Sequence, residues 1–230
     1  MHISNLFNFQ SLLTNTITTT PTTADYRPVI LWHGLGDNYN ASGIHNVNSL
    51  LKDIYPGIFF HSIYIEEDPS SDQQKSLFGD ANKEIEIVCK QLQNIPQLTT
   101  TTTQGIDAIG FSQGGVLLRG LIERCSGIKI NNLITFGSPH MGVMEIKLCN
   151  DNDWFCKRRN EILKKQIWFD NVQKNIIPAQ YFRDPYELDN YLKYSYFLAD
   201  INNERDDKNK TYTKNFSSIN KLVLIQKQVT

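Results

Sequence analysis

The sequence has no surplus of charge of either sign. Its 230 residues carry 23 Lys and Arg against 24 Asp and Glu, a net charge of −1 at pH 7, with the two signs mixed along the chain. Nucleic acids and anionic membrane surfaces are bound by basic patches, so the composition argues against both kinds of partner. The chain also lacks an apolar run approaching the roughly 18 residues of a spanning helix, and we expect no transmembrane segment.

The first residues lack the patterns of a folded element and of a secretory signal. Residues 1–26 alternate apolar and polar side chains and then become threonine-rich, with neither a basic start nor a continuous apolar core. Such a segment is too polar to bury itself. We therefore expect a low-complexity, disordered segment over residues 1–26 without a recognisable signal peptide, followed by one domain over residues 27–230.

Cysteine is scarce, with four residues: Cys89, Cys125, Cys149 and Cys156. No flanking histidines suggest zinc, so we predict no metal site. Four cysteines allow three disulfide connectivities, among which the sequence alone does not choose. The alternative to disulfide bonds is that all four cysteines are buried thiols in a protein of a reducing compartment.

What the chain does contain is Gly110-Phe-Ser112-Gln-Gly114, a match to G-x-S-x-G, the nucleophile elbow of α/β-hydrolases. An apolar strand over residues 106–111 precedes it, and a helix-competent run over residues 116–124 follows. The turn in such an elbow is so sharp that the serine takes strained backbone angles, and the two glycines leave room for neighbouring backbone. Ser112 is therefore the candidate nucleophile, with the N–H of Gln113 directed at an oxyanion. The alternative is an ordinary strand–helix turn with an exposed serine.

An earlier apolar strand, residues 28–32, ends in His33-Gly-Leu35-Gly-Asp37. A glycine-rich turn after an early strand is where α/β-hydrolases place the second oxyanion donor, which by position is the N–H of Leu35. A turn whose glycines only satisfy backbone geometry is the alternative. We interpret His33 as structural, because the hydrolase order is nucleophile, acid and then base.

Apolar strand-like segments alternate with helical ones along the rest of the chain. We predict helices over residues 44–55 and 80–93, and strands over residues 58–65, 132–137 and 221–226. This alternation predicts an α/β fold, a mostly parallel sheet flanked by helices, of the α/β-hydrolase type. A mainly helical insertion is expected over about residues 143–215. Its many aromatic side chains are either core or the lid and acyl groove of a hydrolase.

The chain resembles the palmitoyl-protein thioesterases, lysosomal α/β-hydrolases that remove fatty acyl groups from cysteine. The resemblance covers residues 28–225 and rests on four blocks in order: WHGLGD at 32–37, GFSQGG at 110–115, AQYFRDP at 179–185 and YFLADINNER at 196–205. It implies a thioesterase without a cofactor, with nucleophile Ser112 and oxyanion donors Leu35 and Gln113. S-acylated proteins or peptides and their fatty acyl chains are the implied partners.

The resemblance also implies the disulfides Cys89–Cys125 and Cys149–Cys156. It implies a lysosomal or secreted protein, and three glycosylation sequons favour the same oxidising route: Asn40, Asn209 and Asn215.

The family's triad aspartate follows the strand that is here at residues 222–226, and its histidine lies further on. The sequence stops at Thr230, so we expect neither residue in this chain, nor the fold's last strand and helix. Because serine needs a base, three explanations are open. The chain is a truncated form or an incomplete gene model, or it is an inactive relative that binds acyl chains or acyl-proteins. In the third, His140 serves as a substitute base with an acid such as Asp170 or Asp200; the alternative for His140 is a structural role in its turn.

Overall fold

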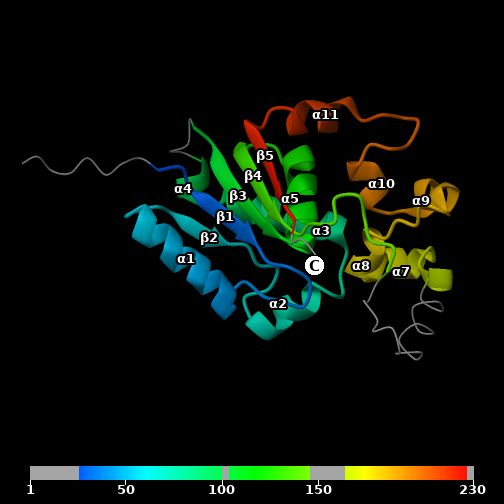
Figure 1. The fold of residues 1–230 in the computed structure, drawn as a ribbon, viewed down its shortest axis with the longest axis horizontal. Coiled ribbons are helices and arrows are strands. Elements are labelled where there is room, and N and C mark those ends of the chain that lie inside the picture. The colour runs from blue at the N-terminus through cyan, green and yellow to red at the C-terminus, as the bar shows by residue number, and fades with distance from the viewer. Residues whose placement is uncertain (1–25, 100–103, 146–163, 227–230) are drawn as a thin grey trace, which may run out of the picture.

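A five-stranded sheet lies at the centre of the computed structural model, which describes residues 26–99, 104–145 and 164–226 (Figure 1). The strands are β1 (Val29–Trp32), β2 (Phe60–Ser62), β3 (Ile106–Phe111), β4 (Ile130–Phe136) and β5 (Lys221–Ile225). Their order in the sheet is β2-β1-β3-β4-β5, and every neighbouring pair is parallel. With helices on both faces, this is the predicted α/β-hydrolase fold.

Burial follows the position of each strand in the sheet. All four residues of β1 are buried, which suits a short apolar strand covered on both faces. In β3, buried and half-buried residues alternate, so one of its faces is covered more fully than the other. All five residues of β5 are exposed, whereas the residues of β2, the other edge strand, are half-buried.

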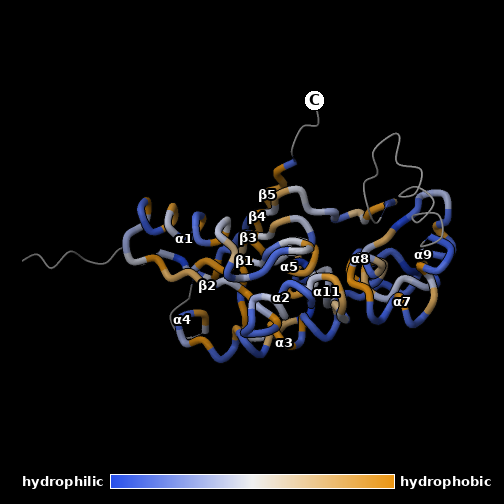
Figure 2. The backbone as a smooth tube through the Cα atoms, turned by 90° about the horizontal axis from the view of Figure 1, so that it is seen from below, coloured by the Kyte–Doolittle hydropathy of each residue, from blue (hydrophilic) through white to orange (hydrophobic). Residues whose placement is uncertain are grey.

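Helices cover the two faces of the sheet unequally. Helix α1 (Ser42–Ile54) lies on one face, and α3 (Ala81–Gln93) and α5 (Gln113–Arg124) lie on the other (Figures 1 and 2). The apolar positions of α3 recur at helical spacing and are buried: Ile85, Val88 and Leu92. Helix α5 packs between the sheet and α3, and 11 of its 12 residues are buried.

The predicted strand over residues 58–65 is shorter in the structure, where β2 contains only Phe60–Ser62. Its sole partner is β1, and the two strands share only three paired positions. Two short helices were not predicted: α2 (Pro69–Lys75) and α4 (Pro96–Thr99). The end of helix α2 contacts the turn after β1.

The segment between β4 and β5 is mainly helical over residues 164–216 and irregular over residues 137–145. Its helices are α7 (Asp170–Asn175), α8 (Ile177–Gln180), α9 (Leu188–Tyr194), α10 (Leu198–Ile201) and α11 (Lys210–Phe216). Four of its aromatic side chains are core residues with at most 4% exposure: Tyr181, Phe182, Tyr191 and Phe197. Tyr186 and Phe169 are exposed instead, so the aromatic residues serve both the core and the surface.

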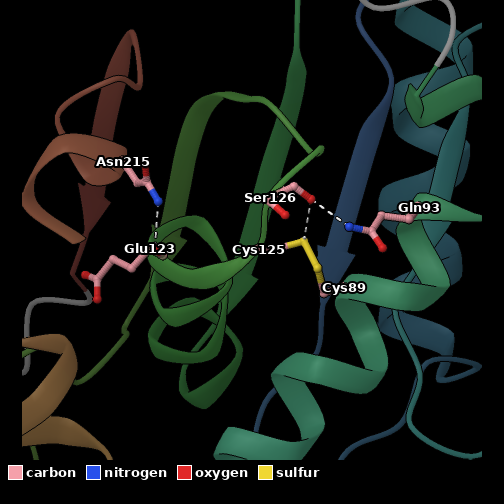
Figure 3. Close-up of a disulfide and its surroundings, with 6 residues drawn as sticks. All are labelled: Cys89, Gln93, Glu123, Cys125, Ser126 and Asn215. Atoms are coloured by element: carbon pink, nitrogen blue, oxygen red, sulfur yellow. Dashed lines mark hydrogen bonds between the residues drawn. A yellow bond between two sulfur atoms is a disulfide. The ribbon is translucent and has the colours of Figure 1, made fainter. Parts of the chain in front are cut away.

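A disulfide joins Cys89 in α3 to Cys125 at the end of α5 (Figure 3). The pairing implied by the family resemblance is therefore confirmed for these two cysteines. Beside it, the Gln93 amide donates a hydrogen bond to the carbonyl of Ser126. The second implied pair, Cys149–Cys156, lies outside the described residues, as do residues 1–25 of the predicted disordered segment.

The three sequons differ in the surroundings of their asparagines. Asn40 and Asn209 are exposed, whereas Asn215 is half-buried and its Nδ2 donates to the carbonyl of Glu123 at 2.8 Å (Figure 3). Glycosylation at these asparagines stays a prediction. None of the helices within the described ranges combines the length and the apolar character that a membrane crossing requires.

Candidate functional site

Ser112 lies where β3 ends and α5 begins. Its backbone has φ 49° and ψ −117°, and a positive φ is costly for a residue with a side chain. The strained residue is held by its own N–H, which donates to the carbonyl of Phe136 in β4 at 2.8 Å. The side chain is exposed, and its hydroxyl makes no hydrogen bond to any described residue. Strained angles at an exposed polar side chain are typical of a functional site rather than of an ordinary turn.

Glycines allow the strand and the helix to approach each other around Ser112. A methyl group on Gly110 would collide with the backbone of Gly115, and one on Gly114 would collide with the carbonyl oxygens of Trp32 and His33. The start of α5 therefore packs directly against the backbone at the end of β1. This contact brings the turn after β1 to the serine.

The turn Gly34–Leu35–Gly36 lies against Ser112. A methyl group on Gly34 would stand 3.3 Å from the Ser112 Cβ, and Gly36 has a φ of 76° that favours glycine. Leu35, between the two glycines, is 37% exposed. No hydrogen bond joins the N–H of Leu35 or of Gln113 to another described residue. Both predicted oxyanion donors are thus beside Ser112 without a partner from the described chain.

The side chain of Gln113, the residue after Ser112, is buried and lies between two hydrogen-bonding partners. Its Nε2 donates to the carbonyl of Ser76 at 3.0 Å, and its Oε1 accepts from the Tyr181 hydroxyl at 3.0 Å. Burial raises the pKa of Tyr181, so the phenol stays protonated and keeps this donor role. Gln113 is therefore fixed at both ends of its amide.

His33 is a structural residue, as its place in the chain predicts. Its Nδ1–H donates to the carbonyl of Gly34 at 3.0 Å, and its Nε2 lies 3.0 Å from Oδ2 of Asp72 in α2. Asp72 also accepts hydrogen bonds from the N–H groups of Tyr39 and Ile65. Burial acts to raise the pKa of Asp72, but the nearby His33 ring and the hydrogen bonds from the two backbone groups outweigh it and lower that pKa.

His140, the candidate substitute base, contacts Thr135 and not Ser112. Its Nε2 lies 3.0 Å from Thr135 Oγ1, and its buried Nδ1 has no hydrogen-bond partner among the described residues. Burial, together with the positive charge of Arg119, lowers the pKa of His140 to about 4. The two acids considered for it are engaged elsewhere: Asp170 pairs with Lys174, and Asp200 pairs with Arg124.

A hollow of about 420 Å³ opens beside His140, at the carboxyl ends of β4 and β5. Its walls include Thr135, the backbone turn over residues 137–142, and Leu224 and Ile225 of the edge strand. Among the described residues no group of three or more His, Cys, Asp and Glu side chains is placed to hold a metal ion. The hydroxyl of Ser112 and the N–H groups of Leu35 and Gln113 remain without partners among the described residues.

Sequence reasoning missed the contribution of α2 to this site. Asp72, Gln73 and Ser76 all contact the turn after β1 or the residue that precedes it. A signal was available, because Asp68 followed by Pro69 is typical of a helix start, and Asp68 does cap α2 by accepting from the N–H of Ser71. The helix itself was therefore detectable from the sequence, whereas its place beside the glycine turn was not.

Comparisons of the sequence with known proteins identify one family. A family model described as palmitoyl protein thioesterase matches residues 28–229. Palmitoyl-protein thioesterase 1 of Caenorhabditis elegans is 34% identical over 212 residues, which are 89% of this chain and 70% of that protein. The lysosomal thioesterase PPT2 of Homo sapiens is 28% identical over 213 residues, 89% of this chain and 64% of that protein. Among solved structures, an alpha/beta hydrolase fold protein of unknown function has a TM-score of 0.38 at 13% identity, covering 89% of this chain and 79% of that one.

Proposed function

Since the chain belongs to the palmitoyl-protein thioesterase family, we propose that it is a serine hydrolase that removes fatty acyl groups from S-acylated cysteines. The observation that carries this proposal is the setting of Ser112. Its exposed hydroxyl stands on a strained turn, beside the Leu35 turn and at the start of a helix. An acyl-transfer nucleophile requires this combination of access and nearby amide donors.

The chemistry proceeds through an acyl-enzyme. Ser112 Oγ attacks the carbonyl carbon of the thioester, and the oxygen that gains charge is held by the N–H groups of Leu35 and Gln113. When the tetrahedral intermediate collapses, the C–S bond breaks and the cysteine leaves as a thiol, which carries the proton that the Ser112 hydroxyl gave up on attack. Water then attacks the ester on Ser112, and the fatty acid is released with the serine restored. No step needs a cofactor.

The proposed substrates are S-acylated proteins or peptides with a fatty acyl chain. Lysosomal or secreted placement is part of the proposal. The Cys89–Cys125 disulfide supports an oxidising route, because disulfides persist in such compartments. The human relative's name supports the lysosome in particular.

One observation favours a second candidate function, a non-catalytic relative that binds acyl chains or acyl-proteins. Ser112 Oγ has no hydrogen-bonding base among the described residues, and His140 presents Nε2 to Thr135 instead. Serine at neutral pH is a weak nucleophile without such a base. Binding of an acyl chain next to Ser112 would not need one.

Hydrolysis of a palmitoyl thioester by the purified chain and by Ser112→Ala separates the two candidates. We expect the Ser112→Ala rate to fall to background, and we expect His140→Gln to stay within about twofold of the parent, because His140 is bonded to Thr135. Equal rates for the parent and Ser112→Ala would favour the binding candidate. A palmitoylated peptide that binds both proteins equally would then support it.

A further inference from the structure

The end of helix α2 is hydrogen-bonded to the glycine turn that contains Leu35. Ser76 Oγ accepts the N–H of Gly36 at 2.8 Å, and Gln73 Nε2 donates to the carbonyl of Gly36 at 2.5 Å. The Ser76 hydroxyl donates in turn to the carbonyl of Gln73 at 2.7 Å. Both backbone groups of Gly36 are therefore held by α2.

Ser76 is also bonded to the other side of the site. Its carbonyl accepts the Gln113 amide at 3.0 Å, and Gln113 is the residue that follows the nucleophile. Ser76 is 4% exposed and Gln113 is 2% exposed, so water competes little for these bonds. One residue thus contacts both segments that supply the proposed oxyanion donors.

Apart from the contacts with α2, the glycine turn is held at the carbonyl of Gly34, which accepts from Asp37 N–H at 3.2 Å and from His33 Nδ1 at 3.0 Å. Neither of these bonds is made by Gly36, which has no side chain to pack. The peptide N–H of Leu35 precedes Gly36 in the chain, so a rotation at Gly36 would tilt the turn that carries it. Oxyanion stabilisation depends on amides that are oriented before the reaction begins.

We propose that Ser76 is a positioning residue that fixes the N–H of Leu35 relative to the N–H of Gln113. The expected effect of Ser76 on catalysis rests on the proposed function. The hydrogen bond from the Gly36 N–H to Ser76 does not, because it is a property of the fold. Ser76 touches neither the substrate nor Ser112 and acts through the turn. A competing structural explanation is that its hydroxyl only terminates α2, where Ser76 is the C-cap.

The test compares Ser76→Ala and Ser76→Thr with Ser195→Ala. Ser195 is a matched control, because it is 2% exposed and its Oγ also accepts a backbone N–H, that of Ala199 at 3.2 Å, away from the site. For Ser76→Ala we expect kcat for a palmitoyl thioester to fall about 10- to 100-fold with KM within about twofold. Ser76→Thr retains the hydroxyl and should restore most of kcat, and Ser195→Ala should keep it.

A second measurement does not depend on activity. Amide hydrogen exchange at Gly36 should become at least about tenfold faster in Ser76→Ala and stay unchanged in Ser195→Ala, because only the first loses the acceptor of the Gly36 N–H. Unchanged exchange at Gly36 in Ser76→Ala overturns the proposal. So does a loss of kcat in Ser76→Ala that is matched by Ser195→Ala.

The two failures remain distinguishable. If the parent chain and Ser112→Ala hydrolyse the thioester equally, the proposed function fails, and Gly36 exchange alone decides whether Ser76 positions the turn. If the parent is active and Ser76→Ala retains its kcat within about twofold, the proposed function stands and the role of Ser76 is overturned.

Discussion

Nε2 of His33 lies 3.0 Å from Oδ2 of Asp72, and the two side chains are 3% and 0% exposed. The pair joins the end of β1 to helix α2 at the place where the glycine turn begins. Asp72 accepts further hydrogen bonds from the N–H groups of Tyr39 and Ile65, so its carboxylate holds three separate segments together.

Asp72→Asn should destabilise the protein by about 3 kcal/mol, because it leaves His33 buried opposite a neutral amide. Asp170→Asn is the control, since Asp170 is exposed and pairs only with Lys174; its effect should be within about 0.5 kcal/mol. Urea denaturation followed by circular dichroism measures both.

The folded pKa of Asp72 is lowered, so the stability that Asp72 contributes is present above the unfolded pKa near 3.8 and is lost as pH falls through the folded value. An Asp72→Asn chain as stable as the parent at pH 6 contradicts the prediction.

Gly114→Ala should destabilise the fold and remove activity, because the new methyl group would stand 2.5 Å from the His33 carbonyl oxygen and closer still to that of Trp32. Both neighbours are backbone, so relief requires the end of β1 to move, at a cost of about 2–3 kcal/mol. Gly43→Ala in α1 is the opposite case. Nothing lies within 4 Å of its added methyl group, so we expect about 0.5–1 kcal/mol of stabilisation. Thermal unfolding of the two variants should give shifts of opposite sign.

Glu84 should make the fold more stable in acid than in weak base. Its side chain is 4% exposed, its Oε1 has no partner among the described residues, and burial raises its pKa to about 8 despite the nearby charge of Lys75. Because the folded pKa lies above the unfolded value of 4.5, the stabilisation is complete below pH 4.5 and is lost as pH rises through 8. Chemical denaturation at pH 5 and pH 8.5 should show a loss of several kcal/mol between them.

Glu84→Gln removes this titration and should reduce the pH dependence to the part that comes from Glu123, whose pKa burial also raises to about 8. Glu86→Gln, on the exposed face of the same helix, should leave the dependence as it is in the parent. Equal slopes in the parent and Glu84→Gln would show that another group controls the stability.

Replacing the disulfide with Cys89→Ala and Cys125→Ala together should cost about 3–4 kcal/mol, the loop-closure value for a separation of 36 residues. Reduction of the parent protein should produce a similar loss, and the midpoint of denaturation reports both. An unchanged midpoint in the double variant would mean that α3 and α5 are held by their packing alone.

The central strands of the sheet could be predicted from the sequence. A short continuous apolar run such as residues 106–111 is typical of a parallel strand that is buried on both faces. The elbow at Ser112 could also be predicted, since its glycines are required by contacts that any strand–helix turn of this kind makes. The pairing of Cys89 with Cys125 came from the family resemblance, because spacing alone leaves three connectivities.

Other features depend on contacts between distant residues and had no local signal. The hydrogen bonds of Ser76 join segments 40 and 37 residues apart, so no window of sequence contains both partners. The partner of His140 is likewise a matter of how the turn after β4 folds back onto Thr135. Strand β2 is short because it pairs with β1 at only three positions. The residues of β2 themselves do not reveal this limit.

Helix α5 carries Ser112 at its start and is enclosed along nearly all of its length by the sheet, α3 and α11. A helix enclosed in this way cannot tilt or slide to suit a bulkier substrate, so under the proposed function the surrounding loops must accommodate different acyl chains. Under the proposed function, changes in those loops alter the chain length that is accepted and leave the position of Ser112 unchanged.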